Sequence, residues 1–124
     1  MRKTILLIDD DAATHILVGK MLEGHYDVAA VFSVDEAFRL LEQGTPDLVL
    51  CDIAMPVHSG IDFLRFRSTD PALKSVPVVT ISATGVRELI TEALEMGADA
   101  CITKPFNRTE LLTTLGHILG SETS

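Results

Sequence analysis

The sequence predicts an α/β domain built on a parallel β-sheet with helices on both of its faces. Short apolar runs of four or five residues alternate with segments whose apolar residues recur at helical spacing. Five strands and five helices are expected, and this alternation is typical of a doubly wound parallel sheet. Four of the five expected strands also end in a polar side chain, and sites in such sheets form at the carboxyl ends of strands.

Composition limits the classes of function. The 124 residues suffice for one domain with a full core, and 47% hydrophobic with 23% charged residues is ordinary for a soluble protein. No apolar run approaches the ~18 residues needed to cross a bilayer, and we expect no signal peptide. We therefore expect a cytoplasmic protein with no membrane partner. The formal charge of −8 argues against direct nucleic-acid binding, which needs a clustered basic surface.

The stretch 48–60 is the centre of the sequence. Residues 48–51 form an apolar run that is too short for a helix and suits a strand buried on both faces. Asp52 ends this run, and Met55-Pro56 with Gly60 then forces a loop. Asp52 is thus expected where a buried strand reaches the surface, although taken alone it could equally cap a turn.

The segments before residue 48 give two strands and two helices. Residues 4–8 are the first expected strand, and residues 26–31 are the second. The helix between them ends at Gly24, and its expected apolar face consists of Ala13, Ile16, Leu17 and Met21. Ser33 and Glu36 read as a capping box for the second helix, which ends at Gly44. Its expected buried face consists of Ala37, Leu40 and Leu41.

The segments after residue 60 give three helices and two strands. A helix beginning near Ile61 is closed by Asp70-Pro71, and a strand over 78–81 follows Pro77. Apolar residues between 89 and 94 predict the next helix, with Gly97 as its stop. The last strand covers residues 100–103. Asn107 and Glu110 then cap the final helix.

Polar residues at the strand ends should meet at one edge of the sheet. They are Asp9, Asp10, Asp52, Ser82 and Lys104. Each has an ordinary explanation by itself, since Asp10 or Ser82 could cap a helix and Lys104 could be a solvated loop residue. Ordinary explanations of this kind do not account for all five residues together.

This set of side chains suits phosphoryl transfer to a carboxylate. An aspartate can act as a covalent nucleophile, and catalysis of phosphoryl transfer is mostly positioning and charge neutralisation. Mg²⁺ favours carboxylates and phosphate oxygens. We expect Asp10 and Asp52 to be direct ligands and Asp9 an outer one. Lys104 would supply a point charge and Ser82 a hydroxyl donor.

These motifs resemble the receiver domain of two-component response regulators. They are Asp9-Asp10, Asp52-x-x-Met55-Pro56-x-x-x-Gly60, Ser82-Ala83 and Lys104-Pro105-Phe106, and the similarity covers essentially residues 1–124 as one receiver domain. The resemblance implies that Asp52 is the phosphoacceptor and that the Ala54 backbone carbonyl completes the Mg²⁺ site. It also implies a hydroxyl switch at Ser82 and a flavodoxin-like sheet in the order 2-1-3-4-5. A cis Lys104-Pro105 bond is implied as well.

Two positions depart from the pattern of the family. Cys101 stands where such receivers usually carry Tyr or Phe, so the usual aromatic switch is replaced by a small side chain. Ala54 is small at a position that is often polar or bulky, which leaves the lifetime of the phosphate open. With the strand order above, Cys51 and Cys101 lie roughly 9–10 Å apart. That separation exceeds the ~7 Å limit for a disulfide, so both should be free thiols.

The resemblance implies a signalling module that accepts a phosphoryl group from a histidine kinase or phosphotransfer protein. It would promote only its own phosphorylation and dephosphorylation, and the partner or fused domain that reads its surface change is open. A phosphohydrolase with an aspartyl nucleophile is one alternative, but such enzymes commonly carry an acid at the position of Ala54. A flavodoxin-like cofactor module is another, but the acidic loop near Asp9 would repel a flavin phosphate. The four histidines show no metal-ligand spacing and are expected at surface or packing positions.

Overall fold

Five parallel strands form one sheet in the computed structural model, which describes residues 2–55, 58–83 and 87–120. The strands are β1 (Thr4–Ile8), β2 (Asp27–Val31), β3 (Leu48–Asp52), β4 (Val78–Ser82) and β5 (Ala100–Thr103). Their order is β2-β1-β3-β4-β5, which confirms the predicted order. The helices are α1 (Ala12–Leu22), α2 (Val34–Leu41), α3 (Gly60–Thr69), α4 (Arg87–Glu95) and α5 (Arg108–Leu119).

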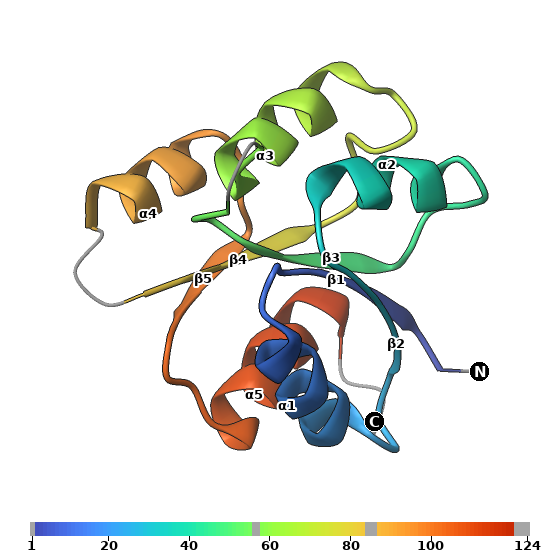
Figure 1. Cartoon of the computed structure of the whole chain (residues 1–124), viewed down its shortest axis with the longest axis vertical. Helices are drawn as coiled ribbons and strands as arrows, with labels where there is room; N and C mark the ends of the chain where they lie inside the picture. Colours follow the sequence, from blue (N-terminus) through green and yellow to red (C-terminus); the bar gives the residue numbers. More distant parts are fainter. Residues whose placement is uncertain (1, 56–57, 84–86, 121–124) are drawn as a thin grey trace.

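The helices cover both faces of the sheet. Figure 1 shows α1 and α5 on one face and α2, α3 and α4 on the other. Strands β3 and β4 are buried along their whole length, as expected for central strands of a parallel sheet. Within the described ranges, no helix combines the length and the apolar character that a membrane span requires.

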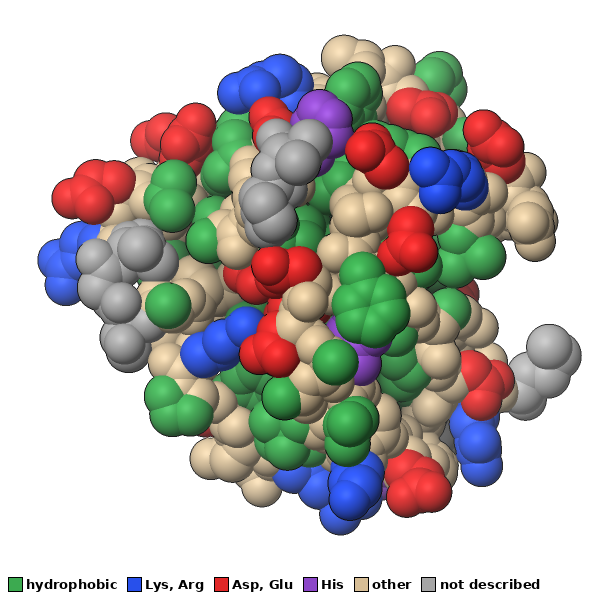
Figure 2. Space-filling view, in the orientation of Figure 1, with side chains coloured by type: hydrophobic (Ala, Val, Ile, Leu, Met, Phe, Trp, Pro, Cys, Tyr) green, Lys and Arg blue, Asp and Glu red, His purple; other side chains and the backbone are tan. Residues whose placement is uncertain are grey.

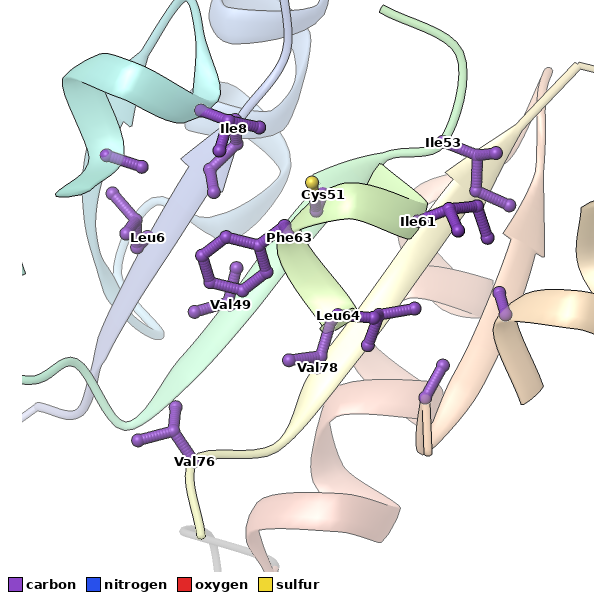
Figure 3. Close-up of a cluster of buried hydrophobic side chains, with 14 residues drawn as sticks. Leu6, Ile8, Val49, Cys51, Ile53, Ile61, Phe63, Leu64, Val76 and Val78 are labelled. Carbon is purple, nitrogen blue, oxygen red and sulfur yellow. The ribbon is translucent and has the colours of Figure 1, made fainter. Parts of the chain in front are cut away.

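Alternate residues of the central strands supply two separate cores, because successive side chains of a strand point to opposite faces. Leu6 and Ile8 of β1 and Val49 of β3 pack toward α2, α3 and α4, and Figure 3 shows Phe63 of α3 beside them. The other core lies under α1 and α5. It contains Ile5, Leu7, Leu48, Leu50, Val18, Leu22, Leu111 and Leu115.

Side-chain caps fix where the helices begin. The predicted capping box of α5 is present, with Asn107 and Glu110 exchanging hydrogen bonds. At α2 the prediction is half right: the Ser33 hydroxyl accepts the Glu36 N–H, but the Glu36 carboxylate accepts the Phe32 N–H at 2.6 Å. These caps satisfy N–H groups that have no partner within the helix.

Most of the apolar residues whose spacing predicted α1 do not lie on its buried face. Ile16 is 63% exposed and Leu17 is 46% exposed, and Ala13 is exposed too, whereas only Met21 packs against the core. The buried residues are Thr14, Val18 and Leu22. Apolar residues lie on more than one side of this helix, so spacing alone allowed two faces. The Asp11 side chain accepts the Ala13 N–H and begins the helix three residues after β1, which selects the other face.

Gly60 brings the start of α3 against the end of β3. A Cβ atom at this position would lie 2.7 Å from the Asp52 carbonyl oxygen and 2.9 Å from the Ile53 Cα. The Gly60 N–H donates to the Ile53 carbonyl at 3.0 Å. Glycine is therefore required here for close approach, and this approach places α3 beside the strand that ends in Asp52.

Candidate functional site

The structure brings together the side chains predicted to meet at the carboxyl edge of the sheet. The Lys104 ammonium lies 3.3 Å from Oδ2 of Asp9 and 3.7 Å from Oδ2 of Asp52. Asp9, Asp10 and Asp52 each offer a carboxylate oxygen, and these oxygens lie within 4.8 Å of one another. Figure 2 shows acidic side chains gathered near the middle of the view with a basic side chain beside them. The Lys104-Pro105 bond is cis, as the resemblance implied.

Asp9 is a fully buried anion whose carboxylate is held by the protein. Its Oδ1 accepts the Asp11 N–H at 2.9 Å, and its Oδ2 accepts from Lys104. Its backbone N–H donates to the Val31 carbonyl, which extends the pairing of β1 with β2 by one residue. The charge of Asp9 is thus fixed in place behind the other two carboxylates.

Asp52 ends β3 and is only 7% exposed. Its Oδ1 accepts the Ala54 N–H at 3.1 Å. Burial and the charge of Asp9 raise the pKa of Asp52 to about 6, against the opposing effect of Lys104. Partial burial lowers the pKa of Lys104, but the carboxylates of Asp52 and Asp9 outweigh it and raise that pKa above its usual value. Burial is the larger cause of the rise in the pKa of Asp52, and the charge of Asp9 adds more to it than Lys104 offsets.

Ser82 carries a buried hydroxyl at the end of β4. The residue is 1% exposed, and its Oγ has no hydrogen-bond partner among the residues that the structure describes. Leaving such a group unpaired costs about 1–3 kcal/mol. Its backbone carbonyl accepts the Lys104 N–H at 2.7 Å, which places Ser82 beside the lysine. An acceptor oxygen of a bound ligand would satisfy this hydroxyl.

Two positions with predicted roles lie at the rim of the site and on β5. Ala54 is exposed, and its N–H contacts Asp52, while the role of its carbonyl toward a metal stays a prediction. Cys101 pairs in register with Thr80 of β4, and its Sγ lies 2.7 Å from the Thr80 hydroxyl oxygen. Cys51 and Cys101 are both free thiols, which confirms that prediction.

His15 is a site neighbour that the sequence did not single out. Its Nε2 lies 2.7 Å from the Asp9 carbonyl oxygen, and its ring stacks on Phe32 with centroids 4.2 Å apart. The only available signal was its position four residues after Asp11, which puts it in the first turn of α1. Spacing gives no indication of a contact back to the preceding strand.

Comparison with known proteins identifies the family to which this arrangement belongs. The family model for the response regulator receiver domain matches residues 5–116. The phosphate regulon transcriptional regulatory protein PhoB of Pseudomonas aeruginosa is 33% identical over 118 residues, which cover 94% of this chain and 52% of that protein. The chain therefore spans about half the length of the curated relatives it matches first.

Solved receiver structures superpose closely on this chain. The chemotaxis response regulator CheY4 of Vibrio cholerae matches with a TM-score of 0.88 and 26% identity, over 96% of this chain and all (100%) of that one. The receiver domain of a Pseudomonas aeruginosa sensor histidine kinase, solved with magnesium in its active site cleft, matches with a TM-score of 0.87 and 27% identity. That match covers 98% of this chain and 100% of the other.

These matches agree with the sheet order and with the acidic strand ends, and none of them points to a phosphohydrolase or a flavin-binding protein. The family model begins in β1 and ends within α5. It therefore covers all five strands and all five helices except for these two ends, which is enough to assign the family. The chain belongs to the response regulator receiver family.

Proposed function

We propose that residues 1–124 act as a single receiver domain in which Asp52 accepts a phosphoryl group from a phosphohistidine of a histidine kinase or phosphotransfer protein. The observation that carries this proposal is the position of the Asp52 carboxylate beside Lys104, at the edge where the Ser82 hydroxyl has no partner in the described part of the chain. The carboxylate oxygen of Asp52 attacks phosphorus, and the P–N bond of the donor breaks. The electron pair leaves with the donor imidazole, which takes up a proton, and Asp52 becomes an acyl phosphate.

The residues around Asp52 orient the carboxylate and neutralise charge. The Ala54 N–H holds Oδ1, so the rotamer of the nucleophile is constrained before a donor arrives. Since the pKa of Asp52 is about 6, the side chain is largely ionised at pH 7 and above, as a nucleophile must be. Lys104 remains protonated and lies where it can offset the charge of the phosphoryl oxygens. Ser82 would donate its hydroxyl hydrogen to one of them.

The acidic cluster fits Mg²⁺, which would neutralise charge on the carboxylates and on the incoming phosphoryl group. Three carboxylate oxygens within 4.8 Å are hard donors of the kind that this ion prefers. Because the Asp9 carboxylate already accepts from Asp11 and Lys104, we assign Asp10 and Asp52 as direct ligands and Asp9 as an outer one. The Ala54 backbone carbonyl would complete the protein ligands.

The phosphodonor would cover an apolar rim beside the site. A groove of about 440 Å³ is lined by Leu17 of α1 and by Lys104, Pro105 and Phe106, and Leu17 is 46% exposed. A donor histidine must reach Asp52, so the protein that carries it has to contact this rim. Exposed apolar side chains there favour such contact. Leu17 contributes to this rim because it lies on the exposed side of α1.

The domain would signal and would process no separate substrate. It would catalyse only its own phosphorylation and the hydrolysis of its acyl phosphate. The output partner or fused domain would read the resulting surface change, and this domain would not itself bind nucleic acid or membrane. Cys101, paired with Thr80, would make a smaller contribution to that change than an aromatic residue.

The test is phosphorylation by acetyl phosphate with Mg²⁺, followed by intact-mass spectrometry and hydroxylamine treatment. We expect one base-labile acyl phosphate on the wild type and none on Asp52→Asn. Asp27→Asn, at an exposed position on β2, is the matched control and should be phosphorylated normally. An unchanged phosphate yield on Asp52→Asn would refute the assignment of the acceptor. Chelating Mg²⁺ should abolish the reaction.

A further inference from the structure

His15 ties the start of α1 to the end of β1. Its Nε2 lies 2.7 Å from the Asp9 carbonyl oxygen, and since a carbonyl only accepts, Nε2 carries the hydrogen and donates it. The imidazole stacks on Phe32 with the two planes 26° apart. Phe32 follows β2, and its N–H donates to the Glu36 carboxylate. His15 is therefore held at two points: its Nε2 by Asp9, which follows β1, and its ring by Phe32, which follows β2.

The bond from His15 completes the polar contacts of Asp9. The Asp9 N–H donates to Val31, and its carboxylate oxygens accept from Asp11 and Lys104. Among the described residues, His15 is the partner of the remaining group, the carbonyl. Asp9 is fully buried, so losing this partner would leave a buried carbonyl unpaired.

The same carbonyl controls the direction of the chain at Asp10. The Asp9 C=O and the Asp10 N–H belong to one planar peptide unit, so fixing the oxygen fixes the plane from which Asp10 extends. Asp10 is exposed, and no described residue forms a hydrogen bond or an ion pair with its carboxylate. The backbone is thus what places the Asp10 carboxylate near Asp52.

We propose that His15 is a positioning residue for the Mg²⁺ site: by holding the Asp9 carbonyl it orients the peptide that presents Asp10. This inference rests on the proposed function, because it assigns Asp10 as a metal ligand. The proposed role of His15 is more than packing, because an apolar side chain could fill the space beside Phe32 but could not donate a hydrogen bond to the Asp9 carbonyl. His15 touches neither the metal nor the phosphoryl group and acts only through the backbone.

The experiment measures Mg²⁺ binding to the unphosphorylated protein by isothermal titration calorimetry. His15→Ala should weaken Mg²⁺ binding about 3- to 10-fold, the effect of one hydrogen bond that positions a ligand. His15→Gln keeps an N–H donor of similar reach and should recover affinity to within about twofold of the wild type. His117→Ala removes an exposed imidazole from α5 and is the matched control. It should bind as the wild type does.

A second readout separates positioning from loss of the catalytic groups. With acetyl phosphate as donor, His15→Ala should be slow at limiting Mg²⁺ and should approach the wild-type rate when Mg²⁺ is saturating. Equal Mg²⁺ affinity of His15→Ala and wild type would overturn the proposal. An affinity of His15→Gln no better than that of His15→Ala would overturn it as well.

If His15→Ala does not fold, a measurement on the wild type still tests the proposal. Long-range ¹H–¹⁵N NMR of the neutral imidazole should show hydrogen on Nε2 of His15. Hydrogen on Nδ1 instead would exclude the bond to Asp9 and refute the inference. The underlying function is tested separately, because its failure would appear as a wild type that neither binds Mg²⁺ nor is phosphorylated.

Discussion

Replacing Asp52 by asparagine should make the metal-free protein more stable at neutral pH, although it removes the proposed phosphoacceptor. In the folded protein, burial and the charge of Asp9 raise the pKa of Asp52 from 3.8 to about 6. The folded state therefore binds this proton more tightly than the unfolded state does, and ionising Asp52 favours unfolding. Asparagine keeps an oxygen for the Ala54 N–H and carries no charge to desolvate.

The size and pH dependence of this effect follow from the pKa shift. A shift of about two units at roughly 1.4 kcal/mol per unit gives a gain on the order of 3 kcal/mol for Asp52→Asn. The wild type loses this stability as the pH rises from about 4 through the folded-state pKa near 6. The difference in the free energy of unfolding between Asp52→Asn and wild type should reach its full size above pH 7. It should shrink below pH 6 and vanish near pH 4.

Urea unfolding in EDTA at pH 4, 5, 6, 7 and 8 measures this difference directly. Asp27→Asn, which removes an exposed carboxylate, should show no comparable trend. Adding Mg²⁺ should raise the stability of the wild type more than that of Asp52→Asn, because only the wild type keeps the full set of carboxylates. An Asp52→Asn protein that is no more stable than wild type at pH 8 would show that burial and the charge of Asp9 do not make ionisation of Asp52 costly in the folded state.

Four further measurements test other parts of the structure. Mg²⁺ affinity, measured by calorimetry, should fall by up to about tenfold per pH unit below pH 6 as Asp52 takes up a proton, and a constant affinity from pH 5 to 8 would contradict its role as a ligand. Gly60→Ala should destabilise the fold by about 1–3 kcal/mol in urea unfolding because its Cβ would meet the Asp52 carbonyl, whereas Gly19→Ala, with nothing within 4 Å, should be neutral or stabilising. Ser82→Ala should stabilise the metal-free protein by about 1 kcal/mol yet slow phosphorylation by acetyl phosphate, and a variant that is destabilised would mean that its hydroxyl is paired. A beryllofluoride phosphate mimic should shift NMR signals near Ser82 and α4 more than those around Cys101, and shifts there as large as those of Cys101→Tyr would contradict this.

The strands were predictable because burial on both faces leaves a direct trace in the sequence. The run that became β3 contains no alternation, and β3 and β4 both end in a polar side chain that the structure places at the site. The order of the strands came from the resemblance to receivers, since no pattern in one strand identifies its neighbour. The strand ends had identified Asp9, Asp52 and Lys104, and the structure places the Lys104 ammonium within 4 Å of both carboxylates.

What could not be predicted depends on how elements rotate against each other. The apolar residues of α1 allowed two buried faces, and the choice was made by the Asp11 cap and the short connection from β1. The contact of Cys101 with Thr80 requires the register of two strands, and the bond of His15 to Asp9 requires the rotation of α1. Neither is encoded in a local spacing.

The ion pair between Lys104 and Asp9 joins residues that lie 95 positions apart in the chain, and it has a consequence for synthesis on the ribosome. The acidic strand ends emerge first, and the lysine that offsets them emerges with the last strand. Until β5 docks, β4 is an edge strand with unpaired backbone groups, although all of its side chains are buried in the finished sheet. A nascent chain that ends before residue 104 therefore carries the proposed acceptor aspartate but lacks the cation beside it, so competence for phosphorylation should arise only after translation has passed β5 and the final strand has joined the sheet.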